Sequence, residues 1–269
     1  MAGTSTGAKN GRQHGLILQP RDLALLRETF LMRVADRELL RIAAGFGSTT
    51  RINTRLLALH RAGLLRRFFL GSGGGRKALY ALSIKGARLI QVPFRGPRRR
   101  QDEMLVADFF VQHQLSINAV YCDLKFGTIP VSQVKFASWQ TFHEPITSAL
   151  NLIPDGYVEF GTPSGIDASF IEVDLGHEGR SVWVEKVNRY IELGDSGEYE
   201  RLFKLPRFRV LVLANSARRL HSIRDAVAKI TPKAFWFAPL DAVTGEKFFG
   251  PVWLRPKGET HQPFFKETI

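Results

Sequence analysis

Cysteine is almost absent from this chain, since Cys122 is the only one among its 269 residues. A single cysteine cannot form an internal disulfide, which excludes the disulfide-stapled class of small secreted domains and favours a reducing, cytoplasmic location. The sequence also lacks an uninterrupted apolar run of the ~18 residues that a membrane span requires, so we expect no membrane partner. Residues 1–15 are small, polar and glycine-rich, without the apolar stretch of a signal peptide. We therefore expect a disordered tail there.

Acidic residues are scarce in the amino-terminal third. Residues 1–101 contain 20 Lys and Arg against 4 Asp and Glu, a net charge of +16, whereas residues 102–269 contain 18 against 21, a net charge of −3. A surface that serves only solubility usually mixes both signs of charge. Basic side chains that contact phosphates release counterions, so a strong excess of positive charge favours a polyanionic partner. We expect that partner to be double-stranded DNA.

Three helices are predicted in the basic third, over residues 21–32, 34–44 and 48–62. On the third, Ile52, Leu56 and Leu59 are spaced i, i+4 and i+7, which places them on one buried side. This is a helix-turn-helix pattern, in which the exposed side of a helix near its beginning enters the major groove. Arg and Asn can read base edges there, while Thr is better suited to phosphates. The candidate DNA contacts on this helix are Thr49, Thr50, Arg51, Asn53, Thr54 and Arg55.

Two short β-prone runs, residues 66–70 and 76–82, flank a glycine cluster at residues 71–75. This pattern predicts a hairpin with basic edges, or wing, and the phosphate-binding GxxxxGK[ST] pattern is absent. Residues 96–101 then form a basic linker between domains, which is a further candidate for backbone contacts. The candidate DNA contacts of the hairpin and linker are Arg66, Arg67, Arg76, Lys77, Arg98, Arg99 and Arg100.

Acidic side chains dominate one side of a later predicted strand. Alternate residues of a strand share a face, so Glu172 and Asp174 point one way in the run 169–174. The run 157–160 is also β-prone, and a hairpin folded near Ser164 would place Asp155 beside Glu172. Two carboxylates so close repel each other unless a positive charge lies between them, and hard oxygen ligands suit Mg²⁺ or Mn²⁺. The predicted metal ligands are Asp155, Glu172 and Asp174.

A helix is predicted over residues 181–193, where Trp183, Lys186 and Tyr190 recur at helical spacing. Lys186 and Tyr190 then lie on one side of the helix. If the site is active, the metal lowers the pKa of a bound water and Lys186 stabilises the phosphate in the transition state. The candidate catalytic residues are Asp155, Glu172, Asp174, Lys186 and Tyr190. The alternatives are that Pro-Asp-Gly is a common turn and that alternating acids are a solvated strand face.

The remaining pattern predicts a helix over residues 102–124, a strand over 131–142, and later strand, helix and strand segments at 208–214, 217–230 and 234–238. Strand and helix alternating in this order predict parallel pairing with right-handed crossovers. On the first of these helices, His113 is interpreted as a hydrogen-bonded, partly buried histidine rather than a catalytic base.

The chain resembles the replication-relaxation family of plasmid and mobile-element proteins over roughly residues 20 to 240, and more distantly the PD-(D/E)XK nuclease superfamily. The resemblance implies an α+β chain: a winged helix-turn-helix domain (16–95), a linker (96–101), a restriction-endonuclease-like domain with a mixed central sheet (102–250) and a carboxy-terminal extension (251–269). The residues that carry it are Arg55-Leu56, Gly63-Leu64-Leu65, Tyr80, Gly86, His113, Asn118, Trp139, Glu144, Pro154-Asp155-Gly156, Glu172-Val173-Asp174, Glu178, Lys186 and Tyr190.

One departure from the nuclease pattern leaves alternatives open. Active nucleases of the wider superfamily carry Lys where this chain has Asp174, so either Lys186 takes over that role from its helix or the domain is non-catalytic. The first alternative is a metal-dependent DNA endonuclease or nickase. The second is a winged-helix replication initiator or transcriptional regulator with a degenerate nuclease fold as scaffold, and a third is an antitoxin or transcription factor with an unrelated α/β domain. Arg55, as a fixed family position, can equally brace the fold. A homodimer and other replication or mobilisation proteins are further expected partners.

Overall fold

The computed structural model describes residues 16–70, 77–95 and 104–265. The predictions for residues 1–15, Arg76 and Arg98–Arg100 lie outside the described residues. The chain divides into two compact units, Met1–Pro97 and Arg98–Ile269. This boundary falls within the predicted linker.

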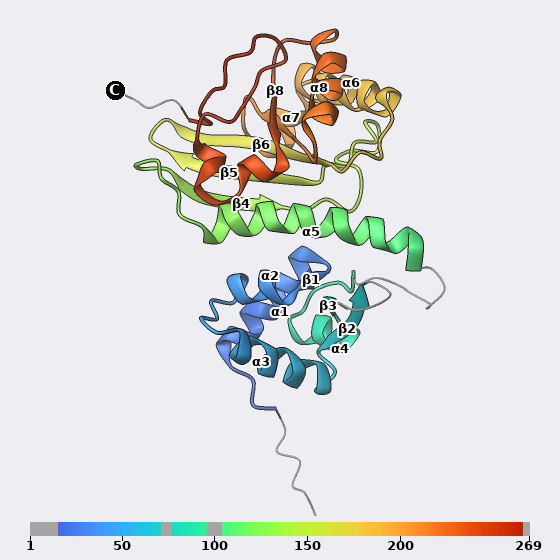
Figure 1. Cartoon of the computed structure of the whole chain (residues 1–269), viewed down its shortest axis with the longest axis vertical. Coiled ribbons are helices and arrows are strands. Elements are labelled where there is room, and N and C mark those ends of the chain that lie inside the picture. Colours follow the sequence, from blue (N-terminus) through green and yellow to red (C-terminus); the bar gives the residue numbers. More distant parts are fainter. Residues whose placement is uncertain (1–15, 71–76, 96–103, 266–269) are drawn as a thin grey trace, which may run out of the picture. The chain divides into compact units, whose positions relative to one another are not determined.

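The first unit combines helices with a small antiparallel sheet, whose strand order is β1-β3-β2 (Figure 1). Its elements are α1 (Pro20–Met32), β1 (Ala35–Asp36), α2 (Arg37–Ala43), α3 (Thr49–Arg61), β2 (Leu65–Leu70), β3 (Lys77–Leu82) and α4 (Ile84–Leu89). The three predicted helices and the predicted hairpin are all present. The sequence did not predict β1 and α4, because two and six residues are too few to show a periodicity.

The core of the first unit follows the helical spacing. On α3, Ile52, Leu56 and Leu59 are each fully buried, as the i, i+4, i+7 pattern predicts. The start of α2 is fixed by Asp36, whose carboxylate accepts a hydrogen bond of 2.9 Å from the Leu39 amide. Such a cap satisfies one of the backbone donors that the first turn of a helix leaves without an intrahelical partner.

The second unit contains a five-stranded sheet with the strand order β4-β5-β6-β7-β8. Its elements are α5 (Met104–Phe126), β4 (Lys135–Gln140), β5 (Gly156–Thr162), β6 (Gly165–Asp174), α6 (Arg180–Asp195), α7 (Glu198–Phe203), β7 (Arg209–Ala214), α8 (Ala217–Ala228), β8 (Phe235–Pro239) and the 3₁₀ helices η2 (Leu240–Val243) and η3 (Gly245–Phe249). Strands β4, β5 and β6 pair antiparallel, whereas β6, β7 and β8 pair parallel. The sheet is therefore mixed, and the predicted parallel pairing is confirmed.

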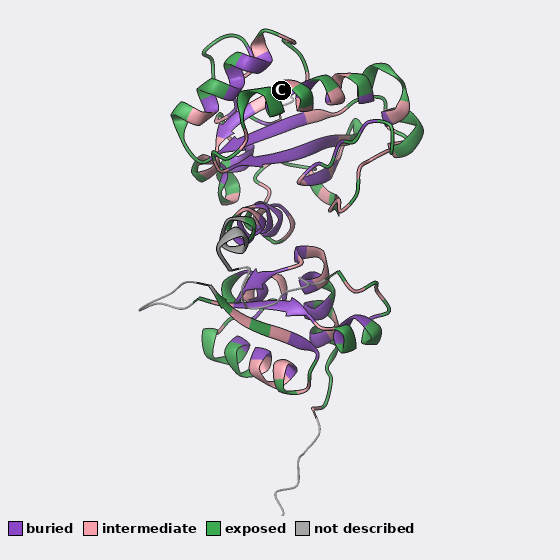
Figure 2. Cartoon of the chain, turned by 90° about the vertical axis from the view of Figure 1, so that its right-hand side faces the viewer, coloured by how far each residue is buried: buried purple, intermediate pink, exposed green. Residues whose placement is uncertain are grey.

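Each face of this sheet supports a hydrophobic core, and Figure 2 shows most of its strands as largely buried. Phe170 and Val212 belong to one core, together with side chains of α6, α7 and α8. Ile171 belongs to the other, with side chains of α5 and of the carboxy-terminal segment. Each such fully buried side chain contributes about 1.5–3 kcal/mol of transfer free energy.

The carboxy-terminal segment is part of this unit rather than an extension of it. Trp253 is fully buried and Phe264 is 1% exposed. The segment is tied to the sheet by an antiparallel bridge between Leu254 and Phe237. The prediction of a separate extension from residue 251 was wrong, because these scattered aromatic residues follow neither a strand nor a helix period and so give no signal in the sequence.

The hairpin of β5 and β6 has the register that strand alternation predicted. Gly156 pairs with Ile171 and Thr162 with Gly165, so the turn lies at residues 163–164 and Asp155 comes opposite Glu172. Gly156 has a packing role as well, since a Cβ atom there would lie 2.4 Å from the Trp139 ring. The glycine of Pro-Asp-Gly therefore makes room for an aromatic side chain of the neighbouring strand.

Candidate functional sites

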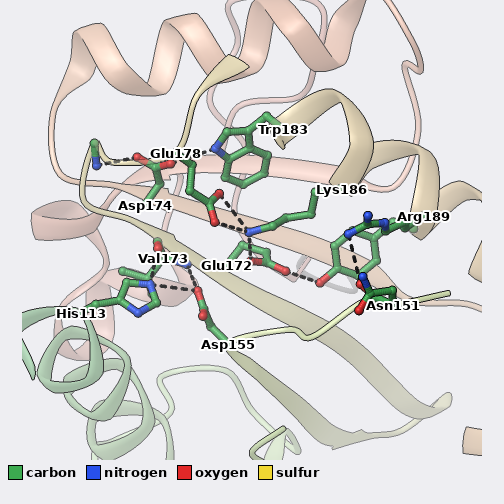
Figure 3. A network of polar contacts seen from close by, with 12 residues as sticks. His113, Asn151, Asp155, Glu172, Val173, Asp174, Glu178, Trp183, Lys186 and Arg189 are labelled. Atoms are coloured by element: carbon green, nitrogen blue, oxygen red, sulfur yellow. Dashed lines mark hydrogen bonds and ion pairs between the residues drawn. The ribbon is translucent and has the colours of Figure 1, made fainter. Parts of the chain in front are cut away.

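The predicted acidic residues meet at the end of β6 (Figure 3). Strand β6 carries Glu172 and Asp174 in its last three residues, and Asp155 immediately precedes β5, the antiparallel neighbour of that end. Because β5 starts where β6 ends, the hairpin itself brings Asp155 to the other two. The hairpin therefore places Asp155 opposite Glu172, as strand alternation predicted.

Asp155 is held by the backbone of β6 and by a histidine of α5. Its Oδ2 atom accepts a hydrogen bond of 2.8 Å from the Val173 amide and lies 3.3 Å from His113 Nε2. The same Nε2 lies 2.8 Å from the Val173 carbonyl oxygen, which can only accept, so this nitrogen carries the proton. Burial alone would lower the pKa of His113, but the Asp155 carboxylate outweighs it and raises that pKa to about 9.

Glu172 is held by two side chains of α6. Its Oε1 atom accepts a 2.5 Å hydrogen bond from the Tyr190 hydroxyl, and its Oε2 atom accepts one of 3.0 Å from Lys186 Nζ. Lys186 also donates to both carboxylate oxygens of Glu178 at 3.0 Å. Burial raises the pKa of Glu172, against the Lys186 ammonium, which lowers it. Burial would lower the pKa of Lys186, but Glu172 and Glu178 raise it above its ordinary value, so the amine stays charged.

Asp174 is fully occupied by structural partners. Its oxygens accept from Arg219 Nε and Nη2, both at 2.6 Å, from the Trp183 indole at 2.8 Å and from the Gly176 amide at 2.7 Å. Burial alone would raise the pKa of Asp174, but these donors hold it below its ordinary value. An aspartate with this many donors acts as an anchor for α6 and α8.

The acids are enclosed rather than open to solvent. The side chains of Glu172 and Asp174 are each 1% exposed, and that of Asp155 is 18% exposed. The loop between β6 and α6 is fixed over them, since Glu178 contacts Lys186 through its side chain and Arg219 through its carbonyl oxygen. Solvent therefore has almost no access to the carboxylates of Glu172 and Asp174.

These side chains do not fit the predicted Mg²⁺ or Mn²⁺ site. Within the part of the chain that the structure describes, no group of three or more His, Cys, Asp or Glu side chains is arranged to hold a metal ion. The physical reason is that the predicted ligands Asp155, Glu172 and Asp174 each already face a cation of the chain. Tyr190, which is also a predicted catalytic residue, is occupied in the same way, because its hydroxyl donates a hydrogen bond to Glu172.

Sequence reasoning did not foresee Arg219, although it lies in the first turn of the helix that follows β7. Parallel neighbouring strands end at the same edge of a sheet. The start of α8 therefore lies beside the end of β6, and this adjacency was the available signal. The interpretation of His113 as a partly buried, hydrogen-bonded histidine is confirmed, but its partner Asp155 was not identified.

The predicted DNA-contacting residues at the start of α3 share one exposed surface. All lie off the side of the helix that buries Ile52, Leu56 and Leu59. The exposed members are Thr49, Thr50, Arg51, Asn53 and Thr54. We call them the α3 surface.

Arg55 does not belong to the α3 surface. Its guanidinium forms an ion pair with Asp22 of α1, and its Nη2 atom also donates to the Ile17 carbonyl at 2.8 Å. Asp22 is 1% exposed, and although burial opposes its charge, the bonds from Arg55 and the Gln19 amide hold its pKa below the ordinary value. These contacts fit the alternative of a brace between α3 and α1, and the DNA-contacting role of Arg55 stays a prediction.

The hairpin of β2 and β3 carries further predicted contacts. Arg67 is exposed, and its guanidinium lies over the Phe69 ring at 5.3 Å. Arg66 is partly buried on the same strand. Lys77 is 54% exposed, although it also forms an ion pair of 2.5 Å with Asp36. Because the Asp36 side chain is only 11% exposed, this ion pair is partly buried, and the DNA contact of Lys77 stays a prediction.

Comparison with known proteins identifies the chain at the level of a family. The family described as Replication-relaxation matches residues 23–205, which is well over half of the sequence. The chain belongs to the replication-relaxation family. Membership supports a role in the replication or relaxation of mobile-element DNA, and the matched residues include the α3 surface as well as the acidic end of β6.

Neither the curated proteins nor the solved structures include a match to this member of the replication-relaxation family. Among its described helices, none is long and apolar enough to cross a membrane.

Proposed function

We propose that this replication-relaxation protein binds double-stranded DNA through its first unit, which is a winged helix, and that its second unit is a nuclease-like fold used as a non-catalytic scaffold. The observation that carries the proposal is the α3 surface. A helix that buries one side completely while exposing Arg51, Asn53 and Thr54 near its start has the chemistry of a major-groove reader.

The order of elements supports the winged-helix assignment. Helix, short strand, two helices and a hairpin follow one another, and the hairpin pairs with the short strand. In such domains a helix enters the major groove while neighbouring elements contact the backbone. Arg67 on β2 is suited to such a contact, and the net charge of +16 over residues 1–101 favours phosphate binding.

The nuclease-like assignment of the second unit is supported by its mixed sheet. Helix α5 precedes the antiparallel strands, and α6 lies between β6 and β7 in the chain. The observation that favours catalysis is that Lys186 contacts Glu172, as expected of a lysine that moved to the helix. The observation against it is that Glu172 and Asp174 are enclosed and paired. The scaffold alternative accounts for both observations.

The test is fluorescence anisotropy of the full-length protein on labelled duplexes enriched from a random library, repeated over a salt series. Arg51→Ala is expected to weaken binding to the enriched duplex by about 1–3 kcal/mol, because a base-reading arginine is lost. Arg67→Ala is expected to weaken enriched and unselected duplexes alike and to reduce the salt slope by about one.

The matched control is Arg61→Ala, which removes the same charge at the opposite end of α3, where Arg61 is also exposed. It is expected to retain the discrimination between enriched and unselected duplexes. If Arg51→Ala and Arg61→Ala change affinity equally, the α3 surface is not the reader and the proposal fails.

A further inference from the structure

The acids at the end of β6 are neutralised one by one, each by a cation from a different helix. His113 of α5 faces Asp155, Lys186 of α6 faces Glu172, and Arg219 of α8 faces Asp174. Helix α5 belongs to the core on one face of the sheet, and α6 and α8 belong to the core on the other. The three pairs therefore join both layers of helices to one end of the central strand.

His113 has a special position among these cations. Its Nε2 atom lies 2.8 Å from the Val173 carbonyl oxygen and 3.3 Å from Asp155 Oδ2, so two hard oxygens point at one nitrogen. A divalent cation prefers such oxygens and needs them at about 2.0–2.6 Å. It can bind here only if the imidazole leaves, and the side chain of His113 is largely buried, with 24% exposed.

The other two ion pairs also occupy the carboxylate oxygens that a metal ion would need. Glu172 uses one oxygen for Tyr190 and the other for Lys186, and Asp174 uses both for Arg219. Removing one member of a buried ion pair leaves an uncompensated charge, which is strongly unfavourable. A metal ion that took these oxygens would neutralise the carboxylates but would leave Lys186 and Arg219 displaced from them and beside another cation.

We infer that the end of β6 is a closed ion-pair lock that takes no divalent cation, in which the His113 nitrogen holds the place between Asp155 and the Val173 carbonyl that a metal ion would need. This inference concerns the second unit alone and stands independently of DNA binding by the first.

The test is titration of the full-length protein with Mn²⁺, followed by the electron paramagnetic resonance signal of the free ion. The wild-type protein is expected to leave that signal unchanged. His113→Ala opens the space between the two oxygens and is expected to withdraw Mn²⁺ from solution, and the further substitution Asp155→Ala is expected to abolish the gain. His221→Ala, which removes an exposed histidine of α8, is the matched control and is expected to behave as wild type.

Two results would overturn the inference. One is Mn²⁺ uptake by the wild-type protein that Asp155→Ala removes, and the other is a folded His113→Ala protein that gains no uptake. If His113→Ala does not fold, the wild-type measurement with its Asp155→Ala partner decides alone. None of these outcomes affects the anisotropy measurement, so failure of the lock and failure of DNA binding are distinguishable.

Discussion

Arg219 forms a two-pronged ion pair with Asp174, in which the Nε–Oδ1 and Nη2–Oδ2 distances are both 2.6 Å. This arginine gives Asp174, the residue at which the sequence departs from the nuclease pattern, a structural partner. The pair fastens the start of α8 to the end of β6.

We predict that breaking this pair destabilises the second unit. Arg219→Ala leaves the buried Asp174 carboxylate without its cation and should lower the free energy of unfolding by about 3–5 kcal/mol. All four tryptophans lie in residues 139–253, so tryptophan fluorescence during denaturant unfolding reports this unit alone. Arg218→Ala, an exposed neighbour on α8, is the control and should change stability by less than about 0.5 kcal/mol. Equal effects would show that the ion pair contributes nothing.

We predict that stability falls at alkaline pH because of His113. Burial alone would lower the pKa of His113, but the hydrogen bond and charge of Asp155, with a smaller effect of the Glu172 charge, raise it from its ordinary value of 6.5 to about 9 in the folded protein. The stabilisation is fully present below pH 6.5 and is lost as pH rises through about 9, with a total on the order of 3 kcal/mol. The measurement is tryptophan-detected unfolding of wild type and His113→Gln across this range. Parallel pH curves for the two proteins would contradict the prediction.

We predict that Gly156 tolerates no side chain. A Cβ atom there would lie 2.4 Å from the Trp139 ring, so Gly156→Ala forces the ring to shift and should cost about 1–3 kcal/mol. Gly161 lies on the same strand, and a Cβ atom there meets only the Lys135 carbonyl oxygen at 3.9 Å. Gly161→Ala should therefore unfold at nearly the wild-type denaturant concentration. A smaller loss for Gly156→Ala than for Gly161→Ala would exclude this packing role.

We predict that neighbouring arginines of α3 have separate roles. Arg55→Ala removes the partner of the buried Asp22 and should destabilise the first unit by about 3 kcal/mol or more. Arg51→Ala should leave stability unchanged and weaken DNA binding instead. Circular dichroism reports the unfolding of the whole chain, and tryptophan fluorescence reports that of the second unit. A loss of stability seen only by circular dichroism would therefore lie in the first unit. The prediction fails if both substitutions reduce stability equally.

The local spacing of residues in the sequence predicted much of the fold and part of the site. The period of two in residues 169–174 and the turn formers before them were enough to set the register of β5 and β6, because slipping by one residue would reverse every side chain. The period of α6 likewise placed Lys186 and Tyr190 together, and both contact Glu172.

The partners of the three acids could not be predicted from local sequence patterns. His113 meets Asp155 across 42 positions and Arg219 meets Asp174 across 45, and neither contact follows from a repeat of two or 3.6 residues. Only the three-dimensional arrangement of α5 and α8 on opposite faces of the sheet brings these cations to one end of β6. For the same reason the sequence suggested a DNA contact for Arg55, because its ion pair with Asp22 of α1 does not follow from the local pattern.

The most direct test of the whole account is to incubate supercoiled plasmid with the full-length protein in Mn²⁺ and to follow binding and cleavage on the same gels. We predict that wild type and Asp155→Ala both retard the plasmid and leave it uncut, whereas Arg51→Ala combined with Arg67→Ala retards it weakly. Nicked or linear DNA produced by wild type and lost in Asp155→Ala would contradict the account, because it would show that the acidic end of β6 is an active site.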